Sequence, residues 1–206
     1  IGFPAVDTYA GTLAAMAILG ALVRRGVTGQ GQRIDLAMFD ASLVFTASAA
    51  VPYLVTGRAL ARTGNTGYSG QPTAAMFATR DGRRISLGVV QQEQYERLCR
   101  ALGRPDLLSD TRFVTPAARL KNSAAMQSEL AAEFARHDGE AIEASLSVAG
   151  VPCGLVRTVP EACEMPHLGE RGMIHEFDAA LPKTAAGRAL NAGFLCDADG
   201  PELPGP

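Results

Sequence analysis

Cysteine and histidine are scarce in this 206-residue sequence, with four copies of the first and three of the second. The cysteines form no CxxC pair, and no histidine stands at metal-ligand spacing from them, so no metal site is expected. Widely spaced cysteines in an ordinary composition are typical of reduced thiols. They predict a cytoplasmic protein.

An excess of charge of one sign is also lacking. The 19 lysines and arginines are balanced by 21 aspartates and glutamates, for a net charge of -2. No block of like charge stands out, so no nucleic-acid partner is expected. No apolar run approaches about 18 residues, so no membrane span or membrane partner is expected. The hydrophobic fraction of 47% is that of a globular protein with a buried core.

The ends of the sequence are those expected of a fragment. It opens on Ile1 rather than Met, without a signal-peptide pattern, and closes on a stretch rich in Gly and Pro, residues 200–206. Its length is about 1.4 times that of a typical domain of roughly 150 residues. We therefore expect one domain and part of another, cut from a longer protein.

Hydrophobic periodicity divides the first third of the sequence. Apolar residues at helical spacing predict a helix from Thr12 to Arg25, and a second from Asp40 to Ala50. Between them, the alternation over residues 34–38 predicts a short strand. Residues 52–72 are punctuated by glycine and have no period, which indicates a linker that leads into a flexible glycine loop.

The middle of the sequence predicts a compact α+β unit over residues 72–150. Asp81-Gly82 between two β-runs is a hairpin signal. An amphipathic helix follows from Gln92 to Leu102. The remaining expected elements are helices at about 117–136 and 139–149, an extended piece at 151–156, a helical turn at 160–163, and strands at 173–177 and 189–195.

Common catalytic motifs are absent: no GxSxG elbow, no P-loop and no GxGxxG after a strand. Two places are nonetheless unusual. Asp7 precedes an apolar helix, where it is either an N-cap or a carboxylate nucleophile towards an activated acyl group. The stretch 64–72 is either a plain interdomain loop or a mobile lid whose bare backbone approaches a reacting centre.

The ordered motifs of the chain begin at these two places. They are Asp7-x-x-x-Gly11; Thr28-Gly29-x-Gly31-Gln32-x-Ile34-Asp35-Leu36-Ala37-Met38-x-Asp40-Ala41; Gly64-Asn65 with Gly67, Gly70, Gln71 and Pro72; Leu102-Gly103-Arg104-Pro105-Asp106-Leu107; Asp110-x-Arg112-Phe113; Arg119-x-x-Asn122; Val151-Pro152-Cys153-Gly154-x-Val156; and Pro166-His167-Leu168-x-x-Arg171-Gly172-Met173. Together they resemble the class III CoA-transferase family, the CaiB/BaiF family, over essentially the whole chain.

The resemblance implies an α/β fold, with an α+β small domain and part of a Rossmann-like large domain that binds CoA. The chain would be the later half of a family member. Residues 1–50 would belong to the large domain, 51–72 to a linker with the glycine loop, 73–150 to the small domain, and 151–206 to a segment that returns to the large domain. Family members are interlocked homodimers, so a second copy is the expected partner.

The resemblance also implies the chemistry, an acyl-CoA:carboxylate CoA transfer in which CoA thioesters are substrates and no cofactor is permanently bound. Asp7 matches the covalent nucleophile, which forms an aspartyl mixed anhydride and then an aspartyl-CoA thioester. Gly67 and Gly70 belong to the loop that closes over the site and supplies backbone N–H groups. Met38 matches a position near CoA, although a packed core methionine is the other interpretation. Tyr68 and Ser69 depart from the run of glycines that several relatives have.

Two alternatives remain open at the level of sequence. An α-methylacyl-CoA racemase of the same superfamily uses an Asp at this place as an acid/base group, together with a His and a Glu. The His would lie upstream of this sequence, and the Glu is expected near Ala78, where this chain has alanine. The other alternative is a non-catalytic fragment or scaffold that keeps the fold without a CoA site.

Overall fold

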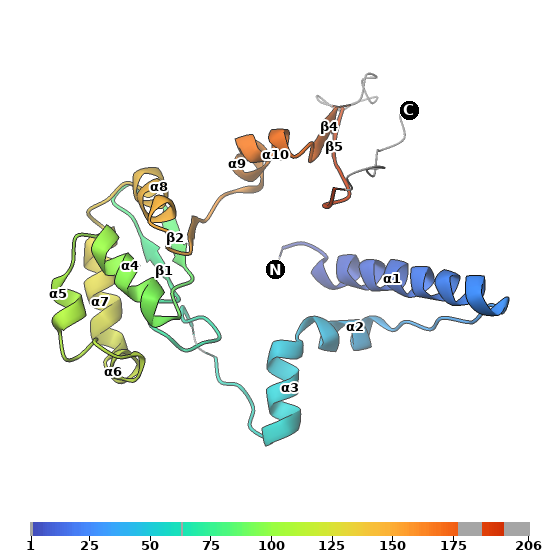
Figure 1. Ribbon diagram of the computed structural model, residues 1–206, viewed down its shortest axis with the longest axis horizontal. Helices are drawn as coiled ribbons and strands as arrows, with labels where there is room; N and C mark the ends of the chain where they lie inside the picture. Colours follow the sequence, from blue (N-terminus) through green and yellow to red (C-terminus); the bar gives the residue numbers. More distant parts are fainter. Residues whose placement is uncertain (1, 63, 177–186, 196–206) are drawn as a thin grey trace. The chain divides into compact units, whose positions relative to one another are not determined.

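A computed structural model describes residues 2–62, 64–176 and 187–195 of the chain (Figure 1). They fall into two compact units, one ending at Arg62 and the other beginning at Thr63. The first unit holds three helices. The second holds a three-stranded sheet with its helices, followed by a two-stranded sheet.

The first helix, α1 (Ala5–Thr28), begins seven residues before the predicted start at Thr12. Pro4 occupies the N-cap position, and Gly29 ends the helix with a φ of 71° while its N–H donates to the carbonyl of Arg25. A left-handed residue at this place is the common end of a helix, and glycine adopts it without steric cost. Asp7 therefore lies inside the first turn, and its interpretation as an N-cap is wrong.

The strand predicted over residues 34–38 is absent. Within the described residues this segment has no ladder partner, and its last residue, Met38, is the first residue of α2 (Met38–Phe45). Alternation of apolar residues does not suffice for a strand, which also needs a neighbour to accept and donate its hydrogen bonds.

The helix predicted from Asp40 to Ala50 is two helices. The first, α2, ends at Phe45, and α3 (Ala47–Thr56) follows after Thr46, at a bend of 84°. Thr46 has left the helical region, with φ of -98° and ψ of 23°. The second helix continues to Thr56 with Pro52 inside it, so the first residues of the expected linker at 51–72 are helical.

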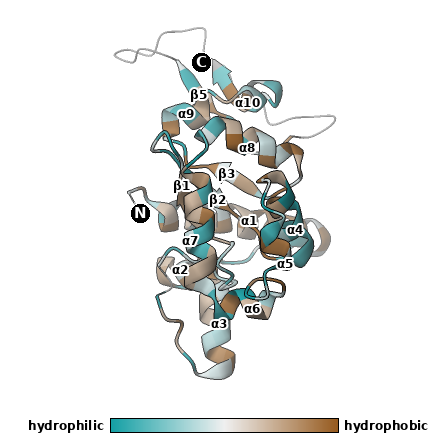
Figure 2. Cartoon of the chain, turned by 90° about the vertical axis from the view of Figure 1, so that its left-hand side faces the viewer, coloured by the Kyte–Doolittle hydropathy of each residue, from teal (hydrophilic) through white to brown (hydrophobic). Residues whose placement is uncertain are grey.

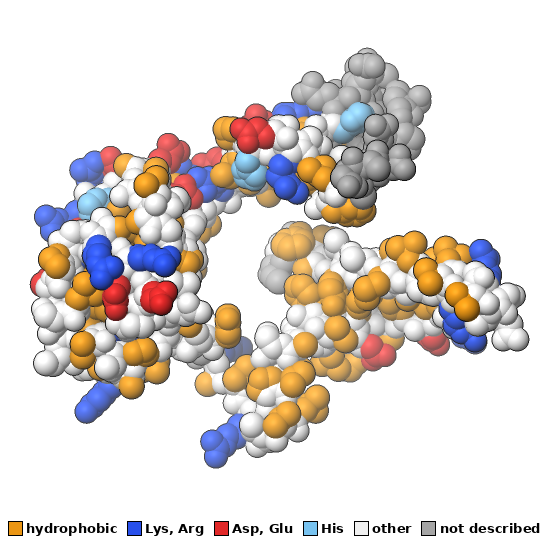
Figure 3. All heavy atoms as spheres, in the orientation of Figure 1, with side chains coloured by type: hydrophobic (Ala, Val, Ile, Leu, Met, Phe, Trp, Pro, Cys, Tyr) orange, Lys and Arg blue, Asp and Glu red, His pale blue; other side chains and the backbone are white. Residues whose placement is uncertain are grey.

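Most apolar side chains of α1, α2 and α3 are exposed, as Figure 3 shows along these helices. Within this unit α1 and α2 pack through the buried Ala10 and Ala41, and the rings of Tyr9 and Phe45 lie 5.2 Å apart. By length and composition alone, α1 is apolar enough to cross a membrane, with a mean hydropathy of 1.6. Core helices of soluble proteins pass the same test, so this helix by itself does not contradict the expectation that no membrane span is present.

The three-stranded sheet of the second unit is antiparallel, in the order β1 (Met76–Ala78), β2 (Arg84–Leu87) and β3 (Cys153–Leu155). The hairpin predicted at Asp81-Gly82 is confirmed, with Gly82 at a φ of 78°. Side chains alternate along the strands as a sheet with one covered face requires. Phe77 and Ile85 are buried, whereas Met76 is exposed.

Helices cover one face of this sheet. The predicted amphipathic helix is α4 (Gln92–Ala101), and α7 (Ser123–Phe134) and α8 (Gly139–Val148) contact β1 and β3 respectively. Their outer surfaces are hydrophilic, which Figure 2 shows for α4 and α7. Between them lies the core, which includes the fully buried Leu98, Met126, Leu130, Phe134 and Leu146.

The helix predicted over residues 117–136 is broken at Asn122, which separates α6 (Pro116–Lys121) from α7. The short helices are α5 (Asp106–Ser109), α9 (Val159–Cys163) and α10 (Pro166–Glu170). Strands β4 (Ile174–Glu176) and β5 (Arg188–Leu190) pair with each other near the predicted positions. The first of these strands was predicted to end at residue 177, which lies outside the described residues.

Candidate active site

Asp7 is the third residue of α1, in the turn where helical N–H groups have no carbonyl partner within the helix. These N–H groups carry positive partial charge, which favours a negative group beside them. The side chain is exposed, and among the described residues its carboxylate has no hydrogen-bond or ion-pair partner. The carboxylate is therefore free to react with a ligand that reaches this turn.

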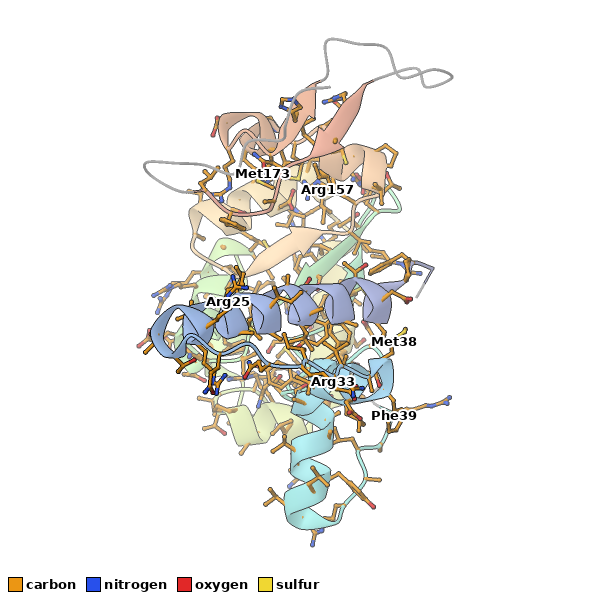
Figure 4. All side chains as sticks on the ribbon, turned by 90° about the vertical axis from the view of Figure 1, so that its right-hand side faces the viewer. Arg25, Arg33, Met38, Phe39, Arg157 and Met173 are labelled. Carbon is orange, nitrogen blue, oxygen red and sulfur yellow. The ribbon has the colours of Figure 1, made fainter. Side chains whose placement is uncertain are left out.

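Met38 begins α2, and its side chain is 51% exposed (Figure 4). Because α2 packs on α1 through Ala41 and Ala10, Met38 lies on a helix that adjoins the one bearing Asp7. The unit does not bury Met38 as a core methionine would be buried. Its thioether and methyl group are free for contact with a ligand.

The glycine loop runs antiparallel beside β1. The Gly67 N–H donates to the carbonyl of Ala74 at 2.8 Å, and Thr66 forms a β-bridge with Ala75. The side chain of Asn65 continues this pairing with the backbone of Met76. The loop therefore begins as an extra edge of the sheet.

A tight turn forms the tip of the loop. The Gly70 N–H donates to the Gly67 carbonyl at 2.9 Å, and Gly70 has a φ of 71°. Both glycines predicted to supply N–H groups to the site thus use them within the loop. Tyr68 and Ser69 occupy the corners of the turn, and among the described residues their N–H groups have no hydrogen-bond partner. The donors that remain free at this tip belong to Tyr68 and Ser69.

An open pocket of about 440 Å³ lies between the loop and the sheet. Its lining is mostly backbone and small side chains, which leaves the main-chain groups accessible. The residues that line it are Gly64 to Ser69, Ala74 to Met76, Ser86 to Gly88, and Val90. Asn65 is part of this lining, and sequence reasoning assigned it no role; the signal was its place after Gly64 in the loop motif.

The strand position that a racemase would need for its Glu holds no acid. Ala78 ends β1, is exposed, and pairs with Arg84 of β2. No neighbouring strand residue replaces the missing carboxylate, because the partner at this register is a cation.

Cys99 and Cys153 are poorly suited to act as nucleophiles. Burial raises the pKa of Cys99 to about 11, and burial also raises the pKa of Cys153. Thiols with raised pKa values are mostly protonated at neutral pH and react slowly. Within the ranges that the structure describes, no three His, Cys, Asp or Glu side chains form a group that could hold a metal ion.

The predicted residues therefore form two sets. Asp7 and Met38 lie on adjoining helices of the first unit, whereas Gly67 and Gly70 lie in the loop of the second. Each set is ordered within its own unit, with a carboxylate at a helix start in one and a fastened turn above a pocket in the other.

Comparison with known proteins matches the chain to several CoA-transferases. It is 32% identical over 174 residues to a succinyl-CoA–D-citramalate CoA-transferase of Chloroflexus aurantiacus, a match that covers 84% of this chain and 43% of that protein. It is 31% identical over 168 residues to an acetyl-CoA:oxalate CoA-transferase of Acetobacter aceti, with coverages of 82% and 43%. The chain thus spans less than half the length of these relatives.

The fold has a counterpart among solved structures. A CaiB/BaiF family protein from Brucella suis superposes with a TM-score of 0.72 at 29% identity, over 98% of this chain and 53% of that one. The model of CoA-transferase family III matches residues 1–194. Since this match includes both the helix of Asp7 and the glycine loop, the chain belongs to CoA-transferase family III.

Proposed function

We propose that the full-length protein is an acyl-CoA:carboxylate CoA-transferase in which Asp7 is the covalent nucleophile. The observation that carries the proposal is the exposed carboxylate in the first turn of α1, without a partner among the described residues, at the position that the motif resemblance assigns to the nucleophile. A carboxylate suits the reaction because its acyl derivatives, anhydride and thioester, remain activated. A serine ester would be too stable to pass the acyl group on.

The first half of the reaction loads CoA onto the protein. An oxygen of Asp7 attacks the carbonyl carbon of the donor thioester, the C–S bond breaks, and CoA thiolate leaves a mixed anhydride. The thiolate then attacks the Asp7 carbonyl carbon of this anhydride. The donor acid leaves as a carboxylate, and an Asp7–CoA thioester remains.

The second half passes CoA to the acceptor. The acceptor carboxylate attacks the Asp7–CoA thioester and forms a second mixed anhydride, with CoA thiolate released. The thiolate attacks the acceptor carbonyl, which gives acceptor acyl-CoA and restores the Asp7 carboxylate. Every step exchanges one activated acyl bond for another, so no step is strongly uphill.

Two demands of this chemistry concern the loop. Water must be excluded, because anhydrides and thioesters hydrolyse. Each tetrahedral intermediate also needs hydrogen-bond donors for its oxyanion, worth about 3–4 kcal/mol for one well-placed donor. The tip of the loop carries the free N–H groups of Tyr68 and Ser69, which are donors of the kind that an oxyanion needs. Met38 would contact the CoA.

The relatives guide the choice of substrates. Their names include succinyl-CoA and acetyl-CoA as donors, and D-citramalate and oxalate as acceptors. We infer that the acceptor here is a small carboxylic acid. The proposal includes a cytoplasmic homodimer, supported by the family resemblance and the exposed apolar side chains of α1 to α3.

The test is to trap the intermediate on the full-length protein. The protein is incubated with a panel of acyl-CoAs, quenched with hydroxylamine, and digested for peptide mass spectrometry, with Asp7→Asn as control. A hydroxamate at Asp7 that is absent from the variant supports the proposal and identifies the donor. No adduct, together with solvent deuterium entering the acyl α-carbon, would show a racemase instead. Neither signal with any acyl-CoA would favour a non-catalytic scaffold.

A further inference from the structure

The carboxamide of Asn65 behaves as a peptide unit of an additional strand. Its Nδ2 donates to the carbonyl oxygen of Met76 at 2.7 Å, and its Oδ1 accepts the N–H of Met76 at 2.9 Å. This is the paired exchange that two opposite residues of an antiparallel ladder make. Here a side chain makes it, across eleven positions of sequence.

Two backbone contacts follow in the same register. Thr66 bridges Ala75, and the Gly67 N–H donates to the Ala74 carbonyl at 2.8 Å. The chain is thus fastened at three successive points before it turns at Tyr68 and Ser69. Asn65 supplies the outermost point, where the pairing would otherwise fray into the preceding glycine, Gly64, whose φ is 60°.

The position of the fastening matters to the pocket. Asn65, Gly67 and Met76 all line the 440 Å³ pocket, so the pairing forms one of its walls. A shift of the strap 65–67 along β1 would move the tip and its free N–H groups by the same amount. Reaction rates are sensitive to such shifts, since a displacement of about 1 Å of a positioned group costs about 100-fold.

We propose that Asn65 is a positioning residue that fastens the glycine loop to β1 and so sets where the loop tip and its free N–H groups lie at the edge of the pocket. This rests on the proposed transferase function. By this proposal Asn65 does not contact the substrate; it acts through the backbone of the loop. When the hydrogen bonds between Asn65 and Met76 are lost, the loop moves away from β1, the rate of transfer falls, and water reaches the aspartyl intermediates.

The requirement for asparagine is chemical. Asp at position 65 would keep the acceptor for the Met76 N–H, but would place a carboxylate oxygen against the Met76 carbonyl oxygen, and two acceptors repel. Ala would remove both bonds. Because Asn65 is exposed, water replaces the lost bonds at little cost to folding, and the variants stay folded.

A matched control exists in the same unit. The Asn122 carboxamide also makes two hydrogen bonds, from Nδ2 to the carbonyls of Arg112 at 3.1 Å and Ala118 at 2.9 Å. It joins α6 to α7 and does not line the pocket. Asn122→Asp therefore introduces the same charge and removes both of the donated bonds, away from the loop.

The experiment compares Asn65→Asp, Asn65→Ala and Asn122→Asp in the full-length protein. Steady-state transfer gives kcat and KM, and thiol release without acceptor gives hydrolysis of the thioester. Both Asn65 variants are expected to lose about 100-fold in kcat with little change in KM, and to hydrolyse a larger share of acyl-CoA per transfer. Asn122→Asp is expected to match the wild type in both. Equal behaviour of the Asn65 and Asn122 variants would overturn the inference and leave the transferase proposal intact.

Amide hydrogen exchange measures the fastening independently of turnover. In Asn65→Ala, which removes both bonds, the Met76 and Gly67 amides should exchange faster, while the Leu87 N–H, which donates to the Ala75 carbonyl at 2.9 Å in the ladder of β1 and β2, should stay protected. Unchanged protection of Met76 and Gly67 would refute the fastening. A wild type that transfers no CoA would overturn the proposed function, and the amide exchange would still decide whether Asn65 holds the loop.

Discussion

Gly67 and Ala74 approach so closely that only glycine fits without a shift. The Gly67 N–H donates to the Ala74 carbonyl oxygen at 2.8 Å, and a Cβ on Gly67 would lie 3.1 Å from that same oxygen. The φ of Gly67 is not in the left-handed region, so its backbone conformation does not require glycine. Glycine is needed here because it permits a close contact of backbone with backbone. The loop is thus glycine-rich partly because it is packed.

Gly67→Ala should displace the loop by a few tenths of an ångström and slow CoA transfer by about tenfold, with the fold retained. Gly154→Ala is the matched control, because Gly154 lies in β3 of the same sheet with no atom within 4 Å of an added Cβ. Steady-state kinetics of the two variants checks this. A Gly67→Ala protein as active as Gly154→Ala would contradict the close-contact argument.

Asp7→Asn should abolish transfer, by about 10⁴-fold or more, since amides do not replace a carboxylate nucleophile. The free energy of unfolding should change by less than about 1 kcal/mol, because the side chain is exposed and makes no cap hydrogen bond. Asp40→Asn, in the first turn of α2, is the control for the loss of a helix-start charge. Substantial residual transfer by Asp7→Asn, measured with a saturating donor, would remove Asp7 from the mechanism.

Replacement of Arg119 should lower the stability of the second unit more than replacement of any other charged residue in it. It is 1% exposed, donates to the Phe113 carbonyl at 2.8 Å and to Gln92 at 3.0 Å, and lies 4.0 Å above the ring of Tyr95. Arg119→Met leaves these acceptors unpaired and should lower the free energy of unfolding by about 3 kcal/mol in urea titrations.

The exposed Arg136 provides the comparison for Arg119. Its side chain is 74% exposed and lies 3.5 Å from Glu133. Because the Arg136 guanidinium is exposed and Glu133 keeps Arg104 and His137 as partners, Arg136→Met should change stability by less than about 1 kcal/mol. Equal effects of the two substitutions would mean that the buried network around Arg119 does not stabilise the unit.

Low pH should reduce the stability of the second unit, because it protonates the Glu143 carboxylate. The Arg157 guanidinium beside it, together with the Leu155 N–H at 2.8 Å, holds the pKa of the Glu143 carboxyl below its ordinary 4.5. A carboxyl with a lowered pKa in the folded state contributes stability that is complete above the unfolded pKa and is lost as pH falls through the folded pKa. The Tm advantage of the wild type over Glu143→Gln should therefore be largest near pH 7 and shrink below about pH 4.5.

Glu93→Gln is the control for this pH dependence, because Glu93 is 83% exposed in its pair with Arg97. Its Tm should track that of the wild type across the same pH range. A Glu143→Gln protein whose Tm deficit is constant down to pH 3 would refute the assigned cause.

Cys99 should resist thiol reagents in the folded protein. It is fully buried, and burial raises its pKa to about 11, whereas Cys163 is partly exposed. Iodoacetamide at pH 8 should modify Cys163 in the native protein and Cys99 only after unfolding, as peptide mass spectrometry can show. Labelling of Cys99 at the rate of Cys163 would mean that the core around α4 opens readily.

Local patterns predicted the second unit well. The Asp81-Gly82 turn and the spacing of Tyr95, Leu98 and Cys99 each fix a short element, and the structure has both elements. The first unit was predicted less well. Helix α1 begins at Ala5, directly after Pro4, and the apolar periodicity that begins at Thr12 did not reveal this early start. The segment 34–38 alternates like a strand but has no strand to pair with among the described residues.

The candidate site shows the same division. Asp7 and the glycine loop were recognisable because their motifs are local in sequence. The pairing of Asn65 with Met76 was not, because a side chain there replaces a backbone unit and no periodicity records it. The use of the Gly67 and Gly70 N–H groups inside the loop likewise depends on a contact with Ala74 that composition does not reveal.

The late position of β3 has a consequence for biosynthesis. It pairs with β2, although residues 88–152 separate the two strands. The hairpin of β1 and β2 therefore leaves the ribosome with one edge unpaired, and open strand edges are where nascent chains aggregate. Local helices such as α4 can form early, but the sheet closes only when Leu155 has been translated. A premature stop just before β3 should yield insoluble polypeptide even though nearly all of the core residues are present.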